Sequence, residues 1–102
     1  RWMLSDLSTR GEILVDDGAA EALLYQSSSL LPAGVMGVNG TFQRGDIVYI
    51  STRSHARLAC GITNYQADDV EAIKGLRSNQ IEITLGYHYN QEIVHRNNLV
   101  LL

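Results

Sequence analysis

The sequence predicts a single α+β domain that is rich in β-structure. Its 102 residues suit one domain, and a chain of this size buries enough surface for one core without disulfides or metal. Short apolar runs typical of strands recur along it, for example "IVYIS" at residues 47–51 and "RLACGITNY" at residues 57–65. Residues 18–25 and 68–74 have the apolar spacing of short helices. This mixture is typical of a small α+β domain.

The first strand and the first helix are predicted near the start of this domain. Residues 12–15 form a short apolar strand, and Asp16 or Asp17 can cap the helix that follows. Alanines and Leu23 then recur at helical spacing. The serines of "QSSS" end the helix, because their side chains compete for backbone hydrogen bonds. Residues 18–25 are therefore expected to be helical.

A hairpin is predicted in the middle of the chain. Residues 35–38 read as a strand, and Asn39 and Gly40 follow them. Asn-Gly between apolar runs indicates a hairpin turn, since both residues tolerate positive φ. A second turn at Gly45 precedes the strand "IVYIS".

The second half of the domain is predicted to begin with a strand over residues 57–65. A helix follows, in which Asp68 and Glu71 have the spacing of a capping box and apolar residues share one face. Gly75 suits the left-handed position at the end of this helix.

The segment "SNQIEITLG" is ambiguous from its residues alone. The apolar residues of "IEITL" alternate as in a strand. Asn79 and Glu82, however, have capping-box spacing, and Gly86 would end a short helix. The C-terminal "LVLL" must be buried or paired, because four apolar residues are otherwise unfavourable at a terminus.

Composition restricts the class of protein. The net charge is −3 and the basic residues are scattered singly, which argues against a nucleic-acid binder that relies mainly on electrostatics. The one cysteine, Cys60, cannot form an internal disulfide and is expected to be a small buried residue rather than a nucleophile. No apolar run approaches the length of a membrane span, so we expect a cytoplasmic protein without a membrane partner.

Signatures of catalysis or metal binding are missing from the sequence. There is no phosphate-binding GxxxxGK[ST] motif, and His55, His88 and His95 lack metal-ligand spacing. The acidic pairs at residues 16–17 and 68–69 begin helices, where carboxylates stabilise free N–H groups. We therefore expect no catalytic site and no metal site.

The residues Pro32, Ala33 and Gly34 stand between the first helix and the next strand. Proline has no backbone N–H to donate. Glycine has no side chain, so the backbone beside the small alanine is accessible. Such a surface could admit a ribose-phosphate backbone or a segment of another protein, and a plain connection is the third reading. Gly34 is expected to have a positive φ or a close neighbour.

Several motifs in order resemble the PUA domain, named for pseudouridine synthases and archaeosine transglycosylases. The motifs are "VDDGAAEAL", "SSLLPAGVMGVNGTFQRGDIVYI" and "GITNY", and they cover roughly residues 11–75. The resemblance implies the PUA-type pseudo-barrel, in which short helices pack around mixed strands.

The remaining segments are "ITLGYHY", "EIVHRNNLVLL" and the leading "RW", and they are similar to the tail of the bacterial glutamate 5-kinase family. In that family a PUA domain follows an amino-acid kinase domain that uses ATP and Mg²⁺. The resemblance implies that residues 1–10 lead in from a kinase domain and that residues 11–102 form a PUA domain with a C-terminal extension. It also implies that this part is not itself an enzyme, carries no cofactor, and has a helix at residues 80–85.

Two functions are open for such a domain. It can dock on the kinase domain of the same chain or on a neighbouring subunit, which the neutral, apolar Leu30 and Leu31 and the acidic balance favour. Alternatively it can bind RNA, as PUA domains of RNA-modifying enzymes do, with Tyr25 stacking on a base. In both cases the expected contact face combines the helix with the loop that follows: Gly18, Ala22, Tyr25, Leu31, Pro32, Ala33, Gly34 and Val35.

Overall fold

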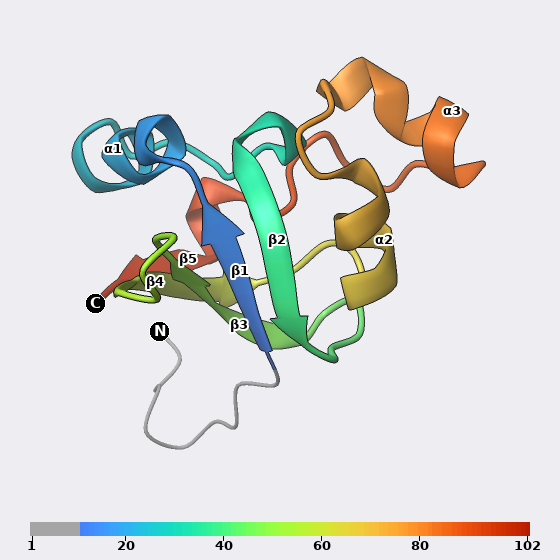
Figure 1. Cartoon of the computed structure of the whole chain (residues 1–102). Coiled ribbons are helices and arrows are strands. Elements are labelled where there is room, and N and C mark those ends of the chain that lie inside the picture. Colours follow the sequence, from blue (N-terminus) through green and yellow to red (C-terminus); the bar gives the residue numbers. More distant parts are fainter. Residues whose placement is uncertain (1–10) are drawn as a thin grey trace.

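The computed structural model describes residues 11–102, which form one mixed sheet with the strand order β2-β1-β3-β4-β5 (Figure 1). The lead-in expected at residues 1–10 lies outside the described residues. The strands are β1 (Gly11–Val15), β2 (Val35–Gly40), β3 (Ile47–Ser51), β4 (Arg57–Ile62) and β5 (Leu99–Leu101). The α-helices are α1 (Asp17–Tyr25), α2 (Ala67–Ile73) and α3 (Ile81–Leu85), and the 3₁₀ helices are η2 (Pro32–Gly34), η3 (Ser78–Gln80) and η4 (Arg96–Asn98). The predicted α+β class is confirmed.

The predicted hairpin at Asn39 and Gly40 is wrong. Both residues belong to β2, which pairs antiparallel with β1, so that Gly40 lies opposite Gly11 and Asn39 opposite Glu12. The next strand, β3, lies on the other side of β1 and runs parallel to it. Gly40 does take a positive φ of 80°. The long-range pairing of β2 with β1, rather than this local conformation, decides the path of the chain.

The first helix forms as predicted, with Asp16 as its N-cap. Oδ1 of Asp16 accepts a hydrogen bond of 2.7 Å from the backbone N–H of Ala19. Asp17 lies in the first turn, where a carboxylate interacts favourably with the helix dipole. The helix ends at Tyr25, and Ser27 has a φ of 50° that turns the chain toward η2.

The strand predicted over residues 57–65 is shorter in the structure, because β4 ends at Ile62. Thr63 begins a turn in which its hydroxyl donates to the carbonyl oxygen of Tyr65 at 2.8 Å. The side chain of Tyr65 is buried in the core, and its hydroxyl donates to the carbonyl oxygen of Asn90 at 2.6 Å. β4 therefore ends at the point where the chain turns to bury the side chain of Tyr65.

The second helix, α2, is present but its predicted capping box is not. The N-cap residue is Gln66, without a side-chain cap bond, and Asp68 already lies within the first turn. Glu71 instead pairs with the ammonium group of Lys74. Gly75 takes a φ of 77°, as predicted for the residue that ends this helix.

The ambiguous segment is helical, as the family resemblance implied. η3 leads directly into α3, and Gly86 ends α3 with a φ of 86°. Ile81 is fully buried, whereas Ile83 is 76% exposed. A strand with one buried face would have buried both isoleucines, since alternate residues share a face.

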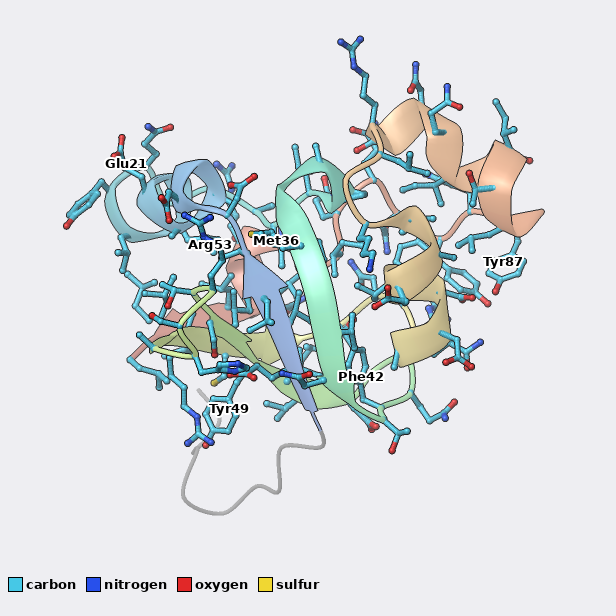
Figure 2. All side chains as sticks on the ribbon, in the orientation of Figure 1. Glu21, Met36, Phe42, Tyr49, Arg53 and Tyr87 are labelled. Carbon is cyan, nitrogen blue, oxygen red and sulfur yellow. The ribbon has the colours of Figure 1, made fainter. Side chains whose placement is uncertain are left out.

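One hydrophobic core lies between the sheet and the helices. In Figure 2, Phe42 packs beside the end of β2, and its carbonyl oxygen accepts from the backbone N–H of Ala67 at 3.0 Å. Cys60 is buried, and burial raises the pKa of its thiol, as expected for a small core residue. The terminal "LVLL" is paired as predicted, because β5 runs antiparallel to β4. The largest fully buried side chains are Tyr65, Ile13, Leu23, Leu30, Ile50, Ile73, Ile81, Ile93, Val15, Val48, Val70 and Val94.

Candidate functional site

A groove lies where α1, η2 and the chain between them meet, beyond the carboxyl end of β1. Its volume is about 350 Å³. Five of the eight residues of the predicted contact face line it, and serines and backbone from the connection complete the wall. The lining residues are Asp16, Gly18, Ala19, Ala22, Ser28, Ser29, Leu30, Leu31, Ala33 and Gly34. We call this surface the α1–η2 groove.

Close contact between Gly34 and Ala19 fixes the floor of the groove. A Cβ atom on Gly34 would lie 2.6 Å from the Cβ of Ala19, far inside van der Waals contact. The carbonyl oxygen of Gly34 also accepts from the backbone N–H of Asp16 at 3.0 Å. Gly34 therefore has the close neighbour that the sequence analysis expected, and its φ is not positive.

The other three residues of the predicted face do not line the groove. Pro32 and Val35 are buried, and the carbonyl oxygen of Pro32 accepts from the backbone N–H of Gly75 at 2.8 Å, which ties η2 to the end of α2. Tyr25 projects from the last turn of α1 and is 79% exposed. Pro32 and Val35 therefore help to position the groove, and Tyr25 flanks it.

The two neighbouring leucines have different environments. Leu30 is almost fully buried and forms an isolated β-bridge with Val94. Leu31 is 45% exposed and is the large exposed apolar side chain in the lining of the groove. The sequence analysis took both leucines as support for docking on a protein. Because the side chain of Leu30 is buried, only Leu31 supports it.

The lining of the groove is close to neutral. Asp16 is its one ionisable lining residue among those the structure describes, and its carboxylate is engaged in capping α1. No lysine or arginine lines this surface within residues 11–102. Such a lining suits an apolar partner better than a phosphate backbone.

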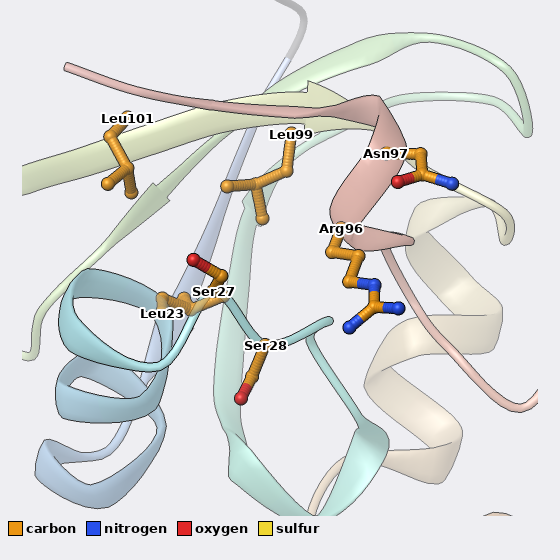
Figure 3. A pocket seen from close by; sticks show the side chains of 7 residues that line it. All are labelled: Leu23, Ser27, Ser28, Arg96, Asn97, Leu99 and Leu101. Atoms are coloured by element: carbon orange, nitrogen blue, oxygen red, sulfur yellow. The ribbon is translucent and has the colours of Figure 1, made fainter.

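A second pocket, of about 230 Å³, adjoins the groove through Ser28 (Figure 3). It is lined by Leu23, Ser27, Ser28, Arg96, Asn97, Leu99 and Leu101. Sequence reasoning did not find Arg96 as a site residue. Arg96 lies in η4, where its backbone N–H donates to the hydroxyl of Ser29 at 2.8 Å, and no local pattern in the sequence signals that contact.

A polar cluster surrounds Glu12 at the opposite end of β1. Burial raises the pKa of Glu12, but the side chains of Ser51, Asn39 and His55 together outweigh burial and hold this pKa below its usual value. Ser51 Oγ is buried and makes no hydrogen bond within residues 11–102. The hydrogen-bond contacts of this carboxylate are Asn39 Nδ2 and His55 Nδ1, which lie 3.1 Å and 2.9 Å from Glu12 Oε1.

A second polar contact joins α2 to the chain after α3. The hydroxyl of Tyr87 donates to the carboxylate of Asp69, with both oxygens at 2.6 Å, and Asp69 is only 7% exposed. This hydrogen bond and the nearby negative charge raise the pKa of Tyr87 to about 12. Tyr87 thereby supplies a partner for a carboxylate that water scarcely reaches.

Within residues 11–102, no three His, Cys, Asp or Glu side chains stand close enough together to hold a metal ion. No helix in the same range has the length and apolar character needed to cross a membrane.

Comparison with known proteins relates the whole chain to one kind of enzyme. The chain is 52% identical over 102 residues to glutamate 5-kinase from Dehalococcoides mccartyi, 44% identical over 102 residues to that from Desulfotalea psychrophila, and 42% identical over 100 residues to that from Thermus thermophilus. These alignments cover 100%, 100% and 98% of this chain. The chain spans 27% of the length of each of these relatives and matches their C-terminal part.

The fold has solved counterparts. A PUA domain from Aeropyrum pernix, crystallised with tartrate, matches 84% of this chain and 41% of its own with a TM-score of 0.62 and 25% identity. The archaeal box H/ACA sRNP Nop10–Cbf5 complex contains a chain with the same fold, at a TM-score of 0.56 and 22% identity over 84% of this chain and 24% of that one. The family model described as "PUA domain" matches residues 11–85. Together with the five-stranded mixed sheet, this match shows that the chain belongs to the PUA domain family.

Proposed function

We propose that this chain is the non-catalytic C-terminal domain of a cytoplasmic glutamate 5-kinase of proline biosynthesis. The observation that carries this proposal is the 52% identity to such a kinase over the whole of this chain. In that enzyme, ATP and Mg²⁺ would serve a kinase domain that precedes residue 11. That domain would phosphorylate the γ-carboxylate of glutamate, and its catalytic residues would lie outside this sequence.

Within that enzyme, the α1–η2 groove docks on the kinase domain of the same chain or on a neighbouring subunit. The neutral lining of the groove and the exposed side chain of Leu31 support this role. The alanines Ala22 and Ala33 leave the surface open, so an apolar side chain of the partner can enter it. Apolar contacts of this kind form the centre of most protein interfaces.

RNA is the second candidate for the same face. The observation that favours it is Tyr25, whose ring is 79% exposed beside the groove and is free to stack on an unpaired base. The neutral groove lining counts against it, because nucleic-acid sites normally carry basic side chains near the phosphates.

Ala33→Lys separates the two functions. Ala33 is exposed and lines the groove, so a lysine there is tolerated by the fold. In a protein interface the ammonium group would lose water on contact, and we expect binding to the separately expressed kinase domain to weaken by about tenfold. On RNA the same lysine would add about one phosphate contact and steepen the slope of log affinity against log salt by about 0.7.

The matched control is Ala72→Lys, which makes the same change at an exposed position of α2. Both variants are titrated with the kinase domain and with labelled single-stranded RNA at two salt concentrations. A loss of kinase-domain binding in Ala33→Lys alone supports docking, and tighter, more salt-dependent RNA binding in that variant alone supports the RNA function. If the two variants behave alike in both titrations, the α1–η2 groove is not the contact surface.

A further inference from the structure

The pocket between α1 and β5 has two chemically different ends (Figure 3). Three leucines, Leu23, Leu99 and Leu101, form one end, and Figure 3 shows them together on the side of the last turn of α1 and β5. Arg96 and Asn97, from η4, stand at the other end. The pocket therefore offers an apolar wall and a cation to the same ligand.

The backbone under Arg96 is held in place by hydrogen bonds. Its N–H donates to the hydroxyl of Ser29 at 2.8 Å, and the next N–H, of Asn97, donates to Nδ1 of His95 at 3.0 Å. The guanidinium itself makes no hydrogen bond or ion pair with any of residues 11–102. In Figure 3 it extends toward the connection that carries Ser28. A positive charge without a partner among the described residues is thus placed at the pocket.

The other charges around the pocket decide how an anion would lie in it. The last turn of α1 ends at Tyr25, so the carbonyl oxygens of this helix end face the region of Ser27 and repel negative charge. The helix end therefore disfavours an acidic group near Ser27, and the guanidinium of Arg96 favours it at the other end of the pocket. The apolar part of the same ligand then lies against the leucines.

One guanidinium matches one carboxylate, with which it can form two parallel hydrogen bonds. A phosphate monoester would keep about one uncompensated charge here, and a phosphodiester would place polar sugars against the leucines. At roughly 30 Å³ for each water-sized group, the pocket of about 230 Å³ holds about seven or eight such groups. That is room for a carboxylate and a chain of about four or five carbons.

We propose that this pocket binds a monocarboxylate with a short aliphatic chain, either a free acid or the C-terminal carboxylate of a peptide. The acid pairs with Arg96, with Asn97 and Ser28 within the same lining, and the alkyl group covers Leu23, Leu99 and Leu101. This site is separate from the groove proposed for docking and shares only Ser28 with it.

The test is a titration of the ¹⁵N-labelled chain with hexanoate, followed by NMR. We expect the amide signals of Ser28, Arg96 and Leu101 to shift and saturate, whereas hexanamide, which has the same chain without the charge, binds at least about tenfold more weakly. Arg96→Gln should weaken hexanoate binding by about tenfold. The matched control is Arg77→Gln, at another exposed arginine, and it should leave the affinity unchanged.

Further arms identify the source of the carboxylate. A tripeptide ending in leucine is compared with its C-terminal amide and with hexanoate. If the tripeptide acid binds more tightly than hexanoate, the natural ligand is a peptide C-terminus; if hexanoate binds more tightly, it is a free acid. Leu101→Ala, at a side chain that is already 46% exposed, should reduce the preference for hexanoate over acetate.

Three results would overturn the proposal. They are equal affinities for hexanamide and hexanoate, an unchanged hexanoate affinity in Arg96→Gln, and binding of a short RNA through Arg96 when the carboxylates do not bind. None of these results depends on the kinase domain, so the docking proposal stands or falls separately.

Discussion

The contact between Gly34 and Ala19 leads to a prediction about the stability of the α1–η2 groove. Gly34→Ala adds one Cβ atom, which would lie 2.6 Å from the Cβ of Ala19. Carbon atoms in good contact are about 3.5–4.0 Å apart, so η2 and α1 must separate by roughly 1 Å. Ala19 cannot swing away, because its Cβ is attached directly to the helix backbone.

This separation has a cost that can be worked out. The hydrogen bond from the N–H of Asp16 to the carbonyl oxygen of Gly34 is 3.0 Å long and would stretch beyond useful length. Losing it costs about 1 kcal/mol, and the forced repacking of a tight contact brings the total to about 2 kcal/mol. With a urea dependence of about 2 kcal/mol per molar, the unfolding midpoint should fall by roughly 1 M.

Urea unfolding of four proteins tests the reasoning: the unchanged chain, Gly34→Ala, Ala19→Gly and the double variant. Ala19→Gly costs about 1 kcal/mol by itself, because glycine disfavours a helix. It removes the atom that the new Cβ would strike, so Gly34→Ala should then cost less than about 0.5 kcal/mol. Gly37→Ala is the control, since nothing lies within 4 Å of its added atom. Equal costs of Gly34→Ala in both backgrounds would refute the steric explanation.

Two further predictions concern pH. The pKa of Glu12 is lower in the folded chain than in the unfolded chain, so its contacts with Asn39 and His55 stabilise the fold above the unfolded pKa, and this contribution is lost as pH falls through the folded pKa. Glu12→Gln should therefore flatten the decline of the urea midpoint as pH falls below about 5, and an unchanged decline contradicts the assignment. The pKa of Tyr87 is raised to about 12, so its bond to Asp69 stabilises the fold below the unfolded pKa and is lost as pH rises through about 12. Tyr87→Phe should lower the midpoint at neutral pH and remove the most alkaline step of the phenolate absorbance titration; retention of that step would show that another tyrosine carries it.

Features that depend on a few neighbouring residues were predictable from the sequence. Asp16 caps α1 and Gly75 ends α2, because a cap needs only the residue itself and the adjacent turn, whereas the helix that Gly86 ends was ambiguous from its residues alone. The groove was also largely predictable. Its lining comes from one stretch, residues 16–34, in which the helix, connection and turn are consecutive.

Features that depend on distant partners were not predictable. Asn39 and Gly40 carry the local signal of a hairpin, but pairing of β2 with β1 uses them as strand residues. Leu30 and Leu31 look alike in the sequence, and only the bridge of Leu30 to Val94 buries one and leaves the other exposed. For the same reason Arg96 was not found, since it lines a pocket with serines almost seventy positions earlier in the chain.

The C-terminal segment, beyond the family match that ends at residue 85, helps to position both candidate surfaces. The backbone N–H of Leu30 donates to the carbonyl oxygen of Val94 at 2.9 Å, and that of Ile93 donates back to Leu30 at 2.8 Å. A third hydrogen bond runs from the backbone N–H of Arg96 to the hydroxyl of Ser29. Because these three bonds hold the connection between α1 and η2, the shape of the α1–η2 groove depends on residues that the general PUA pattern does not include. The alignment with the kinases, in contrast, covers this segment as well, which supports the proposal that the groove binds a partner within such an enzyme.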